Sequence, residues 1–331
     1  MRYVLVTGGN GFIGSHLVRR LVDKGVRVRC LVREISDLRL LEGIEVEYVY
    51  GELSDYHSLE LAISKVDTVF HLAAKIKSSD NEGYYQTNVM GTMNILKTIV
   101  YNNPNIQRFV YVSSQTASGP SHDGQPMIES NSANPITSYG ASKLAAEEAV
   151  LAFYPQIPVT IVRPSIVYGQ NAKNIFPFFK LVEKRIKPVL GWRKHYMNYI
   201  FIDDLIQGLL LVAEKEKAIG QIYFLGSEFQ TTYQDLNKVV ATVLAKRAIT
   251  VHIPIRFVAV SIFIFGFISK ITGKPAVLDR QRVQDLKQRF WTCDSSKARK
   301  ELGFQPVFSL EQGLKACVDW YKERGWLWKE K

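Results

Sequence analysis

One residue pair near the middle of the chain has the types and spacing needed for proton transfer at a hydroxyl or carbonyl group. Tyr139 and Lys143 lie four positions apart in the segment Tyr-Gly-Ala-Ser-Lys, and residues four apart share one face of a helix. A free tyrosine has a pKa of about 10, and a neighbouring ammonium lowers that pKa because it favours the phenolate. The pair therefore predicts a tyrosine that acts as a general acid or base near neutral pH.

A short apolar run upstream, residues 109–112, ends in two serines, Ser113 and Ser114. Its β-branched and aromatic content predicts a strand, whose carboxyl end should lie at the same sheet edge as Tyr139. A hydroxyl group there can hydrogen-bond a substrate oxygen while negative charge develops on it. The alternative interpretation is that both serines only end the strand.

A glycine-rich segment near the N-terminus has the order required for binding a dinucleotide. The residues Thr-Gly-Gly-Asn-Gly-Phe-Ile-Gly (7–14) follow an apolar run at 3–6 and precede residues 12–21, which have helical apolar spacing. Glycines let the backbone approach a pyrophosphate, and the N-terminus of the helix offers free N–H groups to the phosphates. The segment therefore predicts a nicotinamide-dinucleotide site.

The end of the second expected strand bears on the choice of cofactor. An NAD enzyme places an acid there for the ribose 2′-hydroxyl, and an NADP enzyme places a basic group for the 2′-phosphate. Arg33 can bind a phosphate in bidentate fashion, which favours NADP(H). Glu34 lies ~20 residues past the glycines, as a ribose-binding acid would, and it keeps NAD(H) open. Glu52, after the third strand, is either an acceptor for the adenine amino group or a surface acid.

Strand-like and helix-like segments alternate over the first 170 residues, and they must position these groups. We expect strands at 3–6, 26–32, 46–50, 68–71, 109–112 and 159–162, separated by helical segments such as 84–100 and 142–153. This alternation predicts an α/β fold, a Rossmann-type doubly wound parallel sheet with right-handed crossovers. Helices dominate later, with isolated strands at 221–224 and 251–253. We expect a dinucleotide-binding domain over 1–170 and a smaller, mostly helical substrate lobe over 171–331, some of whose segments return to the Rossmann core.

Composition limits the partners. The net charge is +11, and the excess of Lys and Arg lies in the later half of the chain. It predicts an anionic substrate or lipid surface near that lobe, or only a solvated basic face. No nucleic-acid motif is present, so we expect no nucleic-acid partner.

The three cysteines form neither a disulfide framework nor a metal cluster. A strand begins at once with no secretory signal ahead of it, which predicts a cytoplasmic protein.

Residues 257–269 form a very apolar run flanked by Arg256 and Lys270. The run is too short to span a bilayer, which needs about 20 residues. It is either a buried helix or pocket wall, or a peripheral membrane contact or lid over an apolar substrate.

Taken together, these motifs resemble the extended short-chain dehydrogenase/reductase superfamily, in its NAD-dependent epimerase/dehydratase group. The matching pieces occur in family order: TGGNGFIG (7–14), HLAA (71–74), Asn88 with Gly91 and Thr92, YVSS (111–114), YGASK (139–143), RPSIVYG (163–169) and FIDDL (201–205). The later segments 290–304, 309–314 and 320–327 look like the 3β-hydroxysteroid dehydrogenase and dihydroflavonol-reductase branch.

The resemblance implies an enzyme in which Ser114, Tyr139 and Lys143 are catalytic, and it favours Ser114 over Ser113. Around the cofactor it implies Gly8, Gly11, Phe12, Ile13, Gly14, Arg33, Glu52, Leu53, Leu72, Ala73, Ala74, Tyr139, Lys143, Pro164 and Ile166. Around the substrate it implies Lys75, Gln115, Thr116, Tyr168 and Phe176. It implies no metal. The family's usual acid at Glu52 is Asp. Family members often pair through helices that correspond to 84–100 and 142–153, which predicts a homodimer.

Two departures from the family distinguish its branches. Sugar-nucleotide dehydratases carry an Asp-Glu pair where this chain has Gln115 and Thr116. Epimerases carry an Arg-Asp pair where this chain has Met197 and Asn198, although Arg193 and Lys194 lie nearby. We therefore expect a reductase or dehydrogenase acting on a secondary alcohol or ketone of a fairly apolar small molecule. A nucleotide-sugar 4-epimerase with tightly bound NAD is the alternative. A non-catalytic NADP-binding protein is disfavoured because both Tyr139 and Lys143 are present.

Overall fold

The protein is described from a computed structural model that covers residues 1–78, 80–255 and 280–327. The apolar run 257–269 lies outside these residues, so the expectations attached to it stay predictions. In the part of the chain that the structure covers, no helix is both long enough and apolar enough to cross a bilayer.

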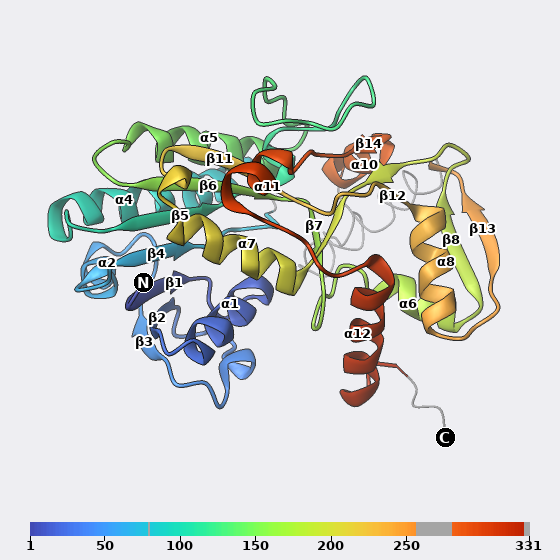
Figure 1. Cartoon of the computed structure of the whole chain (residues 1–331), viewed down its shortest axis with the longest axis horizontal. Coiled ribbons are helices and arrows are strands. Elements are labelled where there is room, and N and C mark those ends of the chain that lie inside the picture. The colour runs from blue at the N-terminus through green and yellow to red at the C-terminus, as the bar shows by residue number, and fades with distance from the viewer. Residues whose placement is uncertain (79, 256–279, 328–331) are drawn as a thin grey trace.

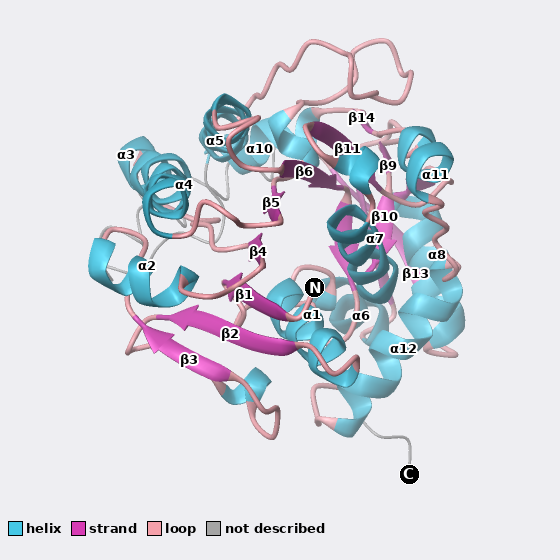
Figure 2. Ribbon diagram, turned by 60° about the vertical axis from the view of Figure 1, so that its left-hand side comes forward, coloured by secondary structure: helices cyan, strands magenta, loops and turns pink. Residues whose placement is uncertain are grey.

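Seven parallel strands form the central sheet, in the order β3-β2-β1-β4-β5-β6-β11 (Figures 1 and 2). The strands are β1 (Tyr3–Thr7), β2 (Arg27–Val32), β3 (Glu47–Tyr50), β4 (Thr68–His71), β5 (Arg108–Val112), β6 (Val159–Pro164) and β11 (Gln221–Leu225). The strand order reverses between β1 and β4, which is where doubly wound sheets bind their ligands, outside the carboxyl ends of the strands. The Rossmann-type fold predicted from the sequence is confirmed.

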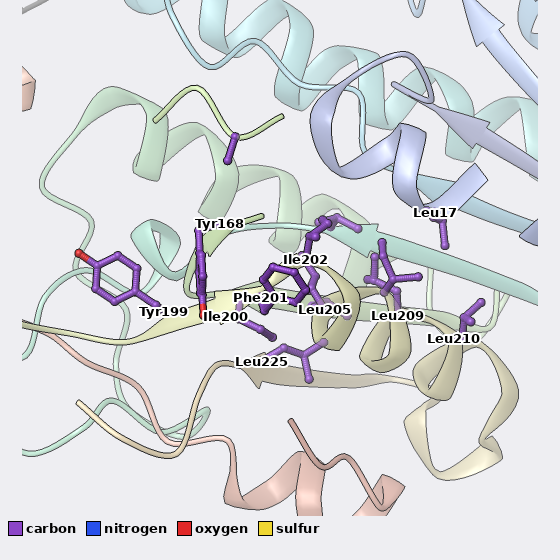
Figure 3. Packing of buried hydrophobic residues seen from close by; sticks show 14 of the residues in the cluster. Leu17, Tyr168, Tyr199, Ile200, Phe201, Ile202, Leu205, Leu209, Leu210 and Leu225 are labelled. Carbon is purple, nitrogen blue, oxygen red and sulfur yellow. The ribbon is translucent and has the colours of Figure 1, made fainter. Parts of the chain in front are cut away.

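Helices cover both faces of the sheet, because successive residues of a strand point to opposite faces. Val4 and Val6 belong to a core shared with α1 (Phe12–Asp23) and α7 (Ile202–Glu214) (Figure 3). Leu5 belongs to a second core. The helices that build this second core are α2 (Tyr56–Ile63), α4 (Gly91–Asn102) and α5 (Ser138–Ala152). The helices α4 and α5, through which a homodimer is expected, pack on each other over this second face.

The later part of the chain adds helices and short strands beside the carboxyl edge of the sheet (Figure 2). The helices are α6 (Phe176–Glu183), α8 (Tyr233–Val243), α10 (Arg280–Lys287), α11 (Ser296–Leu302) and α12 (Leu310–Glu323). The short pairs are β7 (Ile166–Tyr168) with β10 (Tyr199–Phe201), and β8 (Ile186–Leu190) with β13 (Ile249–Ile253). A third small sheet joins β9 (Tyr196–Met197) to β12 (Thr231–Thr232) and β14 (Phe290–Trp291).

One expected strand has a different position from the one predicted. The run near 221–224 was expected to be an isolated strand of the second lobe, but it is β11, which pairs with β6 at the edge of the main sheet. The prediction of an isolated strand was therefore wrong, because the pairing partner, β6, lies about 60 residues away and cannot be read from the local pattern.

Candidate active site

The glycine-rich turn between β1 and α1 lies against the end of β4, at the point where the strand order reverses. Gly8 has a φ of +70°, and a Cβ built there would lie 2.8 Å from the backbone nitrogen of Ala73. A Cβ on Gly14 would lie 2.1 Å from the carbonyl oxygen of Gly8. Glycine is therefore required at both positions by the close approach of backbone to backbone.

Buried polar contacts hold the ends of β1 and β4 together beneath this turn. The Thr7 hydroxyl lies 2.7 Å from Nδ1 of His71 and accepts a hydrogen bond from the backbone N–H of Ala73 at 3.2 Å. Nε2 of His71 lies 3.0 Å from the hydroxyl of Thr92 on α4. Burial lowers the pKa of His71 to about 3, so this histidine is neutral at physiological pH and acts as a structural link rather than a charge.

The residues present at this edge fit a dinucleotide. Gly8 and Gly14 let the turn pack tightly on the backbone around it. Gly11, the residue before α1, provides no side-chain cap, so the N–H groups of the first turn are available to a phosphate. Arg33 and Glu52 are exposed just beyond β2 and β3. The other predicted cofactor residues are distributed over the turn and the neighbouring strand ends: Phe12, Ile13, Leu53, Leu72, Ala73, Ala74, Pro164 and Ile166.

Tyr139 lies in the first turn of α5, and a close backbone contact sets its position. The hydroxyl of Thr137 caps the helix by accepting the N–H of Gly140 at 3.1 Å. A Cβ on Gly140 would lie only 2.4 Å from the carbonyl oxygen of Thr116, so the start of α5 packs directly on the turn that follows β5. This packing brings the Tyr139 side chain close to Ser114, whose hydroxyl acts to lower the pKa of the phenol.

The two serines at the end of β5 have different environments. The Ser114 hydroxyl accepts hydrogen bonds from the Thr116 backbone N–H at 3.2 Å and from the Thr116 hydroxyl at 2.9 Å, and it acts on the pKa of Tyr139. The Ser113 hydroxyl instead donates to the buried carboxylate of Glu147. Ser114 is therefore the serine whose hydroxyl is directed toward the tyrosine end of the site.

Lys143 follows Tyr139 by one turn of α5 and is almost completely buried. Its ammonium donates to the carbonyl oxygen of Val112 at 2.7 Å and lies 4.2 Å from the centroid of the Tyr111 ring. Burial lowers the pKa of Lys143 to about 7, and the charge of Glu147 acts in the opposite direction. Near neutral pH the Lys143 side chain is therefore present in both its charged and its neutral form.

The expected lowering of the tyrosine pKa is wrong for this structure. Burial raises the pKa of Tyr139 to about 12, the phenol of Tyr84 acts in the same direction, and the Ser114 hydroxyl acts the other way. The Tyr84 and Tyr139 rings lie 6.2 Å apart. The Lys143 ammonium is directed to a backbone carbonyl instead. Tyr139 is therefore protonated at neutral pH, the state required of a proton donor.

A buried ion pair lies beside the candidate catalytic residues, and the sequence analysis missed it. Both side chains, Glu147 and Arg163, are nearly inaccessible to water. The Arg163 guanidinium donates to the Glu147 carboxylate through Nη2 at 2.6 Å and through Nε at 3.0 Å. Glu147 lies four residues after Lys143, so a carboxylate on the same helix face was the available signal.

Asn88 is a second side chain whose role was not predicted. It lies in the π-helical turn η2 (Tyr85–Met90), between α3 (Asn81–Tyr84) and α4. Its Oδ1 accepts from the backbone N–H of Lys75 at 2.7 Å, and its Nδ2 donates to the hydroxyl of Ser142 at 2.9 Å. Asn88 thereby ties the segment after β4 to the helix that carries Tyr139 and Lys143.

The residues expected around the substrate do not gather in one place. Gln115 and Thr116 adjoin Ser114, and Lys75 is exposed after β4. Tyr168 is buried in the core, where its ring packs on Phe201 at 5.5 Å and a Cβ on Gly313 would lie 2.4 Å from its hydroxyl. The remaining residue, Phe176, packs on the aromatic rings of α12 and the turn that follows it. The structure thus places Tyr168 and Phe176 in packing against the later part of the chain, away from Ser114.

The residues at the two family departures have structural partners. Asn198, where epimerases carry Asp, is buried, accepts from the Cys293 backbone N–H at 2.9 Å and donates to the carbonyl of Ser227 at 2.9 Å. Arg193 and Lys194 are exposed in the segment after β8.

Among the residues that the structure describes, no group of three His, Cys, Asp or Glu side chains could bind a metal ion.

Comparison with known proteins gives the family. The sequence profile of the NAD dependent epimerase/dehydratase family matches residues 4–226. A putative dihydroflavonol 4-reductase from Synechocystis is 30% identical, over 97% of this chain and 95% of that protein. The chain therefore belongs to the NAD-dependent epimerase/dehydratase family, and it is an oxidoreductase of the NAD(P)-dependent extended short-chain type.

Two further similarities broaden the comparison. A 3-beta-hydroxysteroid dehydrogenase from Mycolicibacterium neoaurum is 26% identical, over 97% of this chain and 91% of that protein. The crystal structure of UDP-glucose 4-epimerase from Thermotoga maritima superposes with a TM-score of 0.80 at 23% identity, over 97% of this chain and 99% of that one. The second likeness is one of fold alone.

Proposed function

We propose that the protein reduces a ketone, or oxidises the corresponding secondary alcohol, on a fairly apolar small molecule, with NADP(H) as the favoured cofactor. The observation that carries this proposal is the packing of the start of α5 on the turn after β5, which places Tyr139 close to Ser114 and beside the buried Lys143 at the carboxyl edge of the sheet. When bound, the nicotinamide supplies or accepts the hydride.

The proton chemistry follows from the protonation states of these residues. Burial keeps the Tyr139 phenol protonated at neutral pH, so it can donate its proton to a substrate oxygen as negative charge develops there. The Ser114 hydroxyl orients the same oxygen. The Lys143 ammonium is within one helical turn and supports the phenolate that remains after the transfer. In the direction of oxidation the same groups act in reverse.

The residues at the two family departures argue against sugar-nucleotide chemistry, and the names of two relatives support an apolar substrate. Gln115 and Thr116 stand where a dehydratase has its acid and base, and neither can protonate a leaving hydroxyl. Where an epimerase has its Arg-Asp pair, Asn198 is committed to backbone partners. The relatives named as a dihydroflavonol reductase and a hydroxysteroid dehydrogenase act, by those names, on largely apolar ring systems.

The preference for NADP(H) rests on the end of β2. Arg33 is exposed there, and its backbone N–H donates to the Ser36 hydroxyl at 3.1 Å, which forms a tight turn just beyond the strand. A guanidinium in this place suits a 2′-phosphate. Glu34 is also exposed, and NAD(H) is the alternative.

The proposal is tested with the full-length protein, NADPH and a panel of 3-oxosteroids and dihydroflavonols. We expect consumption of NADPH by wild type, and loss of turnover in Tyr139→Phe with NADPH affinity within a few-fold of wild type. The matched control is Tyr101→Phe, because Tyr101 is an exposed phenol on α4 that lies outside the site. Wild-type turnover by Tyr139→Phe would refute the assignment.

The epimerase alternative makes a different prediction for the cofactor. An epimerase regenerates its NAD within each turnover and retains it, so purified protein would carry NAD that does not exchange, and UDP-sugars would raise its melting temperature. Free exchange of NADPH with solution, together with no stabilisation by UDP-glucose, would leave the reductase as the function.

A further inference from the structure

The two-stranded sheet β8–β13 carries apolar side chains that face water. The helices α6 and α8 pack on β8, whereas every described residue of β13 is exposed. Ile249 of β13 keeps 71% of its surface accessible, and Trp192, just after β8, keeps 69%. Val251 and Ile253 are also exposed. Apolar side chains grouped in this way on a surface usually mark an interaction site.

The exposed indole is held against the strand. The ring of Trp192 stacks on that of His252 in β13, with centroids 6.1 Å apart and planes inclined by 6°. Nδ1 of His252 lies 2.7 Å from the carbonyl oxygen of Gly191, the residue before the tryptophan. Successive residues of a strand point to opposite faces, so the Trp192 ring stacked on His252 lies on one face of this small sheet and the apolar side chains of β13 lie on the other. Both faces are exposed at the end of the molecule farthest from β3 (Figure 1).

The two chain segments that contain these apolar side chains carry only positive formal charges. Residues 184–202 and 236–255 contain no Asp or Glu. Their cations are Lys184, Arg185, Lys187, Arg193, Lys194, Lys238, Lys246 and Arg247. The acids that flank the two segments are engaged elsewhere: Glu183 pairs with Lys180 at 3.6 Å, and Asp235 accepts from the backbone N–H of Thr232 at the start of α8. We call this set of apolar and basic residues the β8–β13 surface.

We propose that the β8–β13 surface is a docking site for a membrane that contains anionic lipids. Apolar side chains and an indole gain free energy in the boundary between headgroups and acyl chains. Lys and Arg side chains around them are attracted to anionic headgroups. The protein would lie on the bilayer without crossing it.

The distribution of charge favours a lipid surface over a protein partner. Four of the eight cations, Lys187, Lys238, Lys246 and Arg247, line one hollow beside α8, and the other four lie in the segments that flank β8. A protein partner would need acids matched to both groups, whereas a bilayer presents mobile anions to every cation at once. The contact does not depend on the reaction proposed for the active site.

The proposal is tested by sedimentation of the full-length protein with vesicles of phosphatidylcholine, with and without phosphatidylglycerol. We expect the wild type to bind only the anionic vesicles, and added salt to weaken the binding. Each cation near an anionic surface contributes about fivefold to partitioning, so the double variant Lys194→Glu/Lys238→Glu should bind at least ~25-fold more weakly. Ile249→Ser should weaken binding about tenfold.

Matched controls separate the surface from net charge and from hydrophobicity in general. Lys300→Glu/Lys315→Glu makes the same change in charge at exposed sites on α11 and α12, and Val307→Ser removes an apolar side chain that is 68% exposed elsewhere. Both should bind vesicles as wild type does. Equal losses in test and control variants would overturn the proposal. So would a failure of wild type to bind anionic vesicles, or a protein dimer that Ile249→Ser dissociates without any binding to lipid.

Discussion

The buried ammonium of Lys143 should be visible in the pH dependence of stability. Its pKa is lowered by burial from 10.5 to about 7. Between these two values the unfolded chain holds a proton that the folded protein lacks, so the free energy of unfolding rises with pH. Below the lower value the folded protein carries a desolvated charge, and the cost of burying that charge is present in full.

The size of the effect follows from the shift. One pKa unit corresponds to a little over 1 kcal/mol, so the shift of Lys143 is worth about 5 kcal/mol across the whole interval. Lys143→Met removes the titrating group. From about pH 7 to about pH 10 the unfolding free energy of wild type should therefore rise relative to that of the variant by about 1 kcal/mol for each pH unit. The loss of the bond to Val112 adds an offset that does not change with pH.

The assay is urea-induced unfolding, followed by tryptophan fluorescence and by far-ultraviolet circular dichroism at each pH, with the two probes required to coincide. Lys97→Met is the matched control, because Lys97 is exposed on α4. The difference in unfolding free energy between Lys97→Met and wild type should not vary with pH. A difference for Lys143→Met that stays constant from pH 7 to pH 10 would refute the desolvation argument.

Three further substitutions test the site. Glu147→Gln leaves a buried guanidinium without its counter-charge and should lower the free energy of unfolding by about 3–5 kcal/mol. The control variant Ser113→Ala should lower it by only about 1 kcal/mol. Equal losses for the two variants in urea unfolding would contradict the buried ion pair. Gly14→Ala puts a methyl group 2.1 Å from a backbone oxygen. This change should weaken NADPH binding at least tenfold, measured by fluorescence titration. Unchanged affinity would show that the turn does not hold the cofactor. Arg33→Ala should weaken NADPH binding roughly 10- to 100-fold, the worth of a charged hydrogen bond, while NADH binding stays the same; a parallel loss for both would remove the arginine from the 2′-phosphate.

The nucleotide-binding half could be predicted because its signals are local. Buried parallel strands read as short apolar runs, and all seven strands of the sheet begin and end within two residues of the ranges predicted for them, although β11 was not assigned to the sheet. The glycine turn was also predictable, since strand, glycines and helix follow one another directly in the chain. The helix that carries Tyr139 begins at Ser138, four residues before the predicted start, because the cap at Thr137 was not recognised.

The remaining features depend on contacts between distant segments. The sequence around Tyr168 gave no sign that its ring would be enclosed by Phe201 and Gly313. The pKa of Tyr139 could not be judged from Lys143 alone, because burial outweighs the charge and the position of Tyr84 depends on packing. The pairing of Glu147 with Arg163 joins a helix to a strand 16 residues away.

The position of β11 has a consequence for how the chain reaches its native state. The sheet is complete only when Gln221–Leu225 pairs with β6, so a ribosome must release more than two thirds of the polypeptide before the last parallel strand can add. Until then β6 is an open edge, whose unpaired N–H and C=O groups can recruit a strand from another nascent chain. A fragment that stops near residue 170 should therefore aggregate on expression, and chaperones should engage this protein chiefly during that interval of translation.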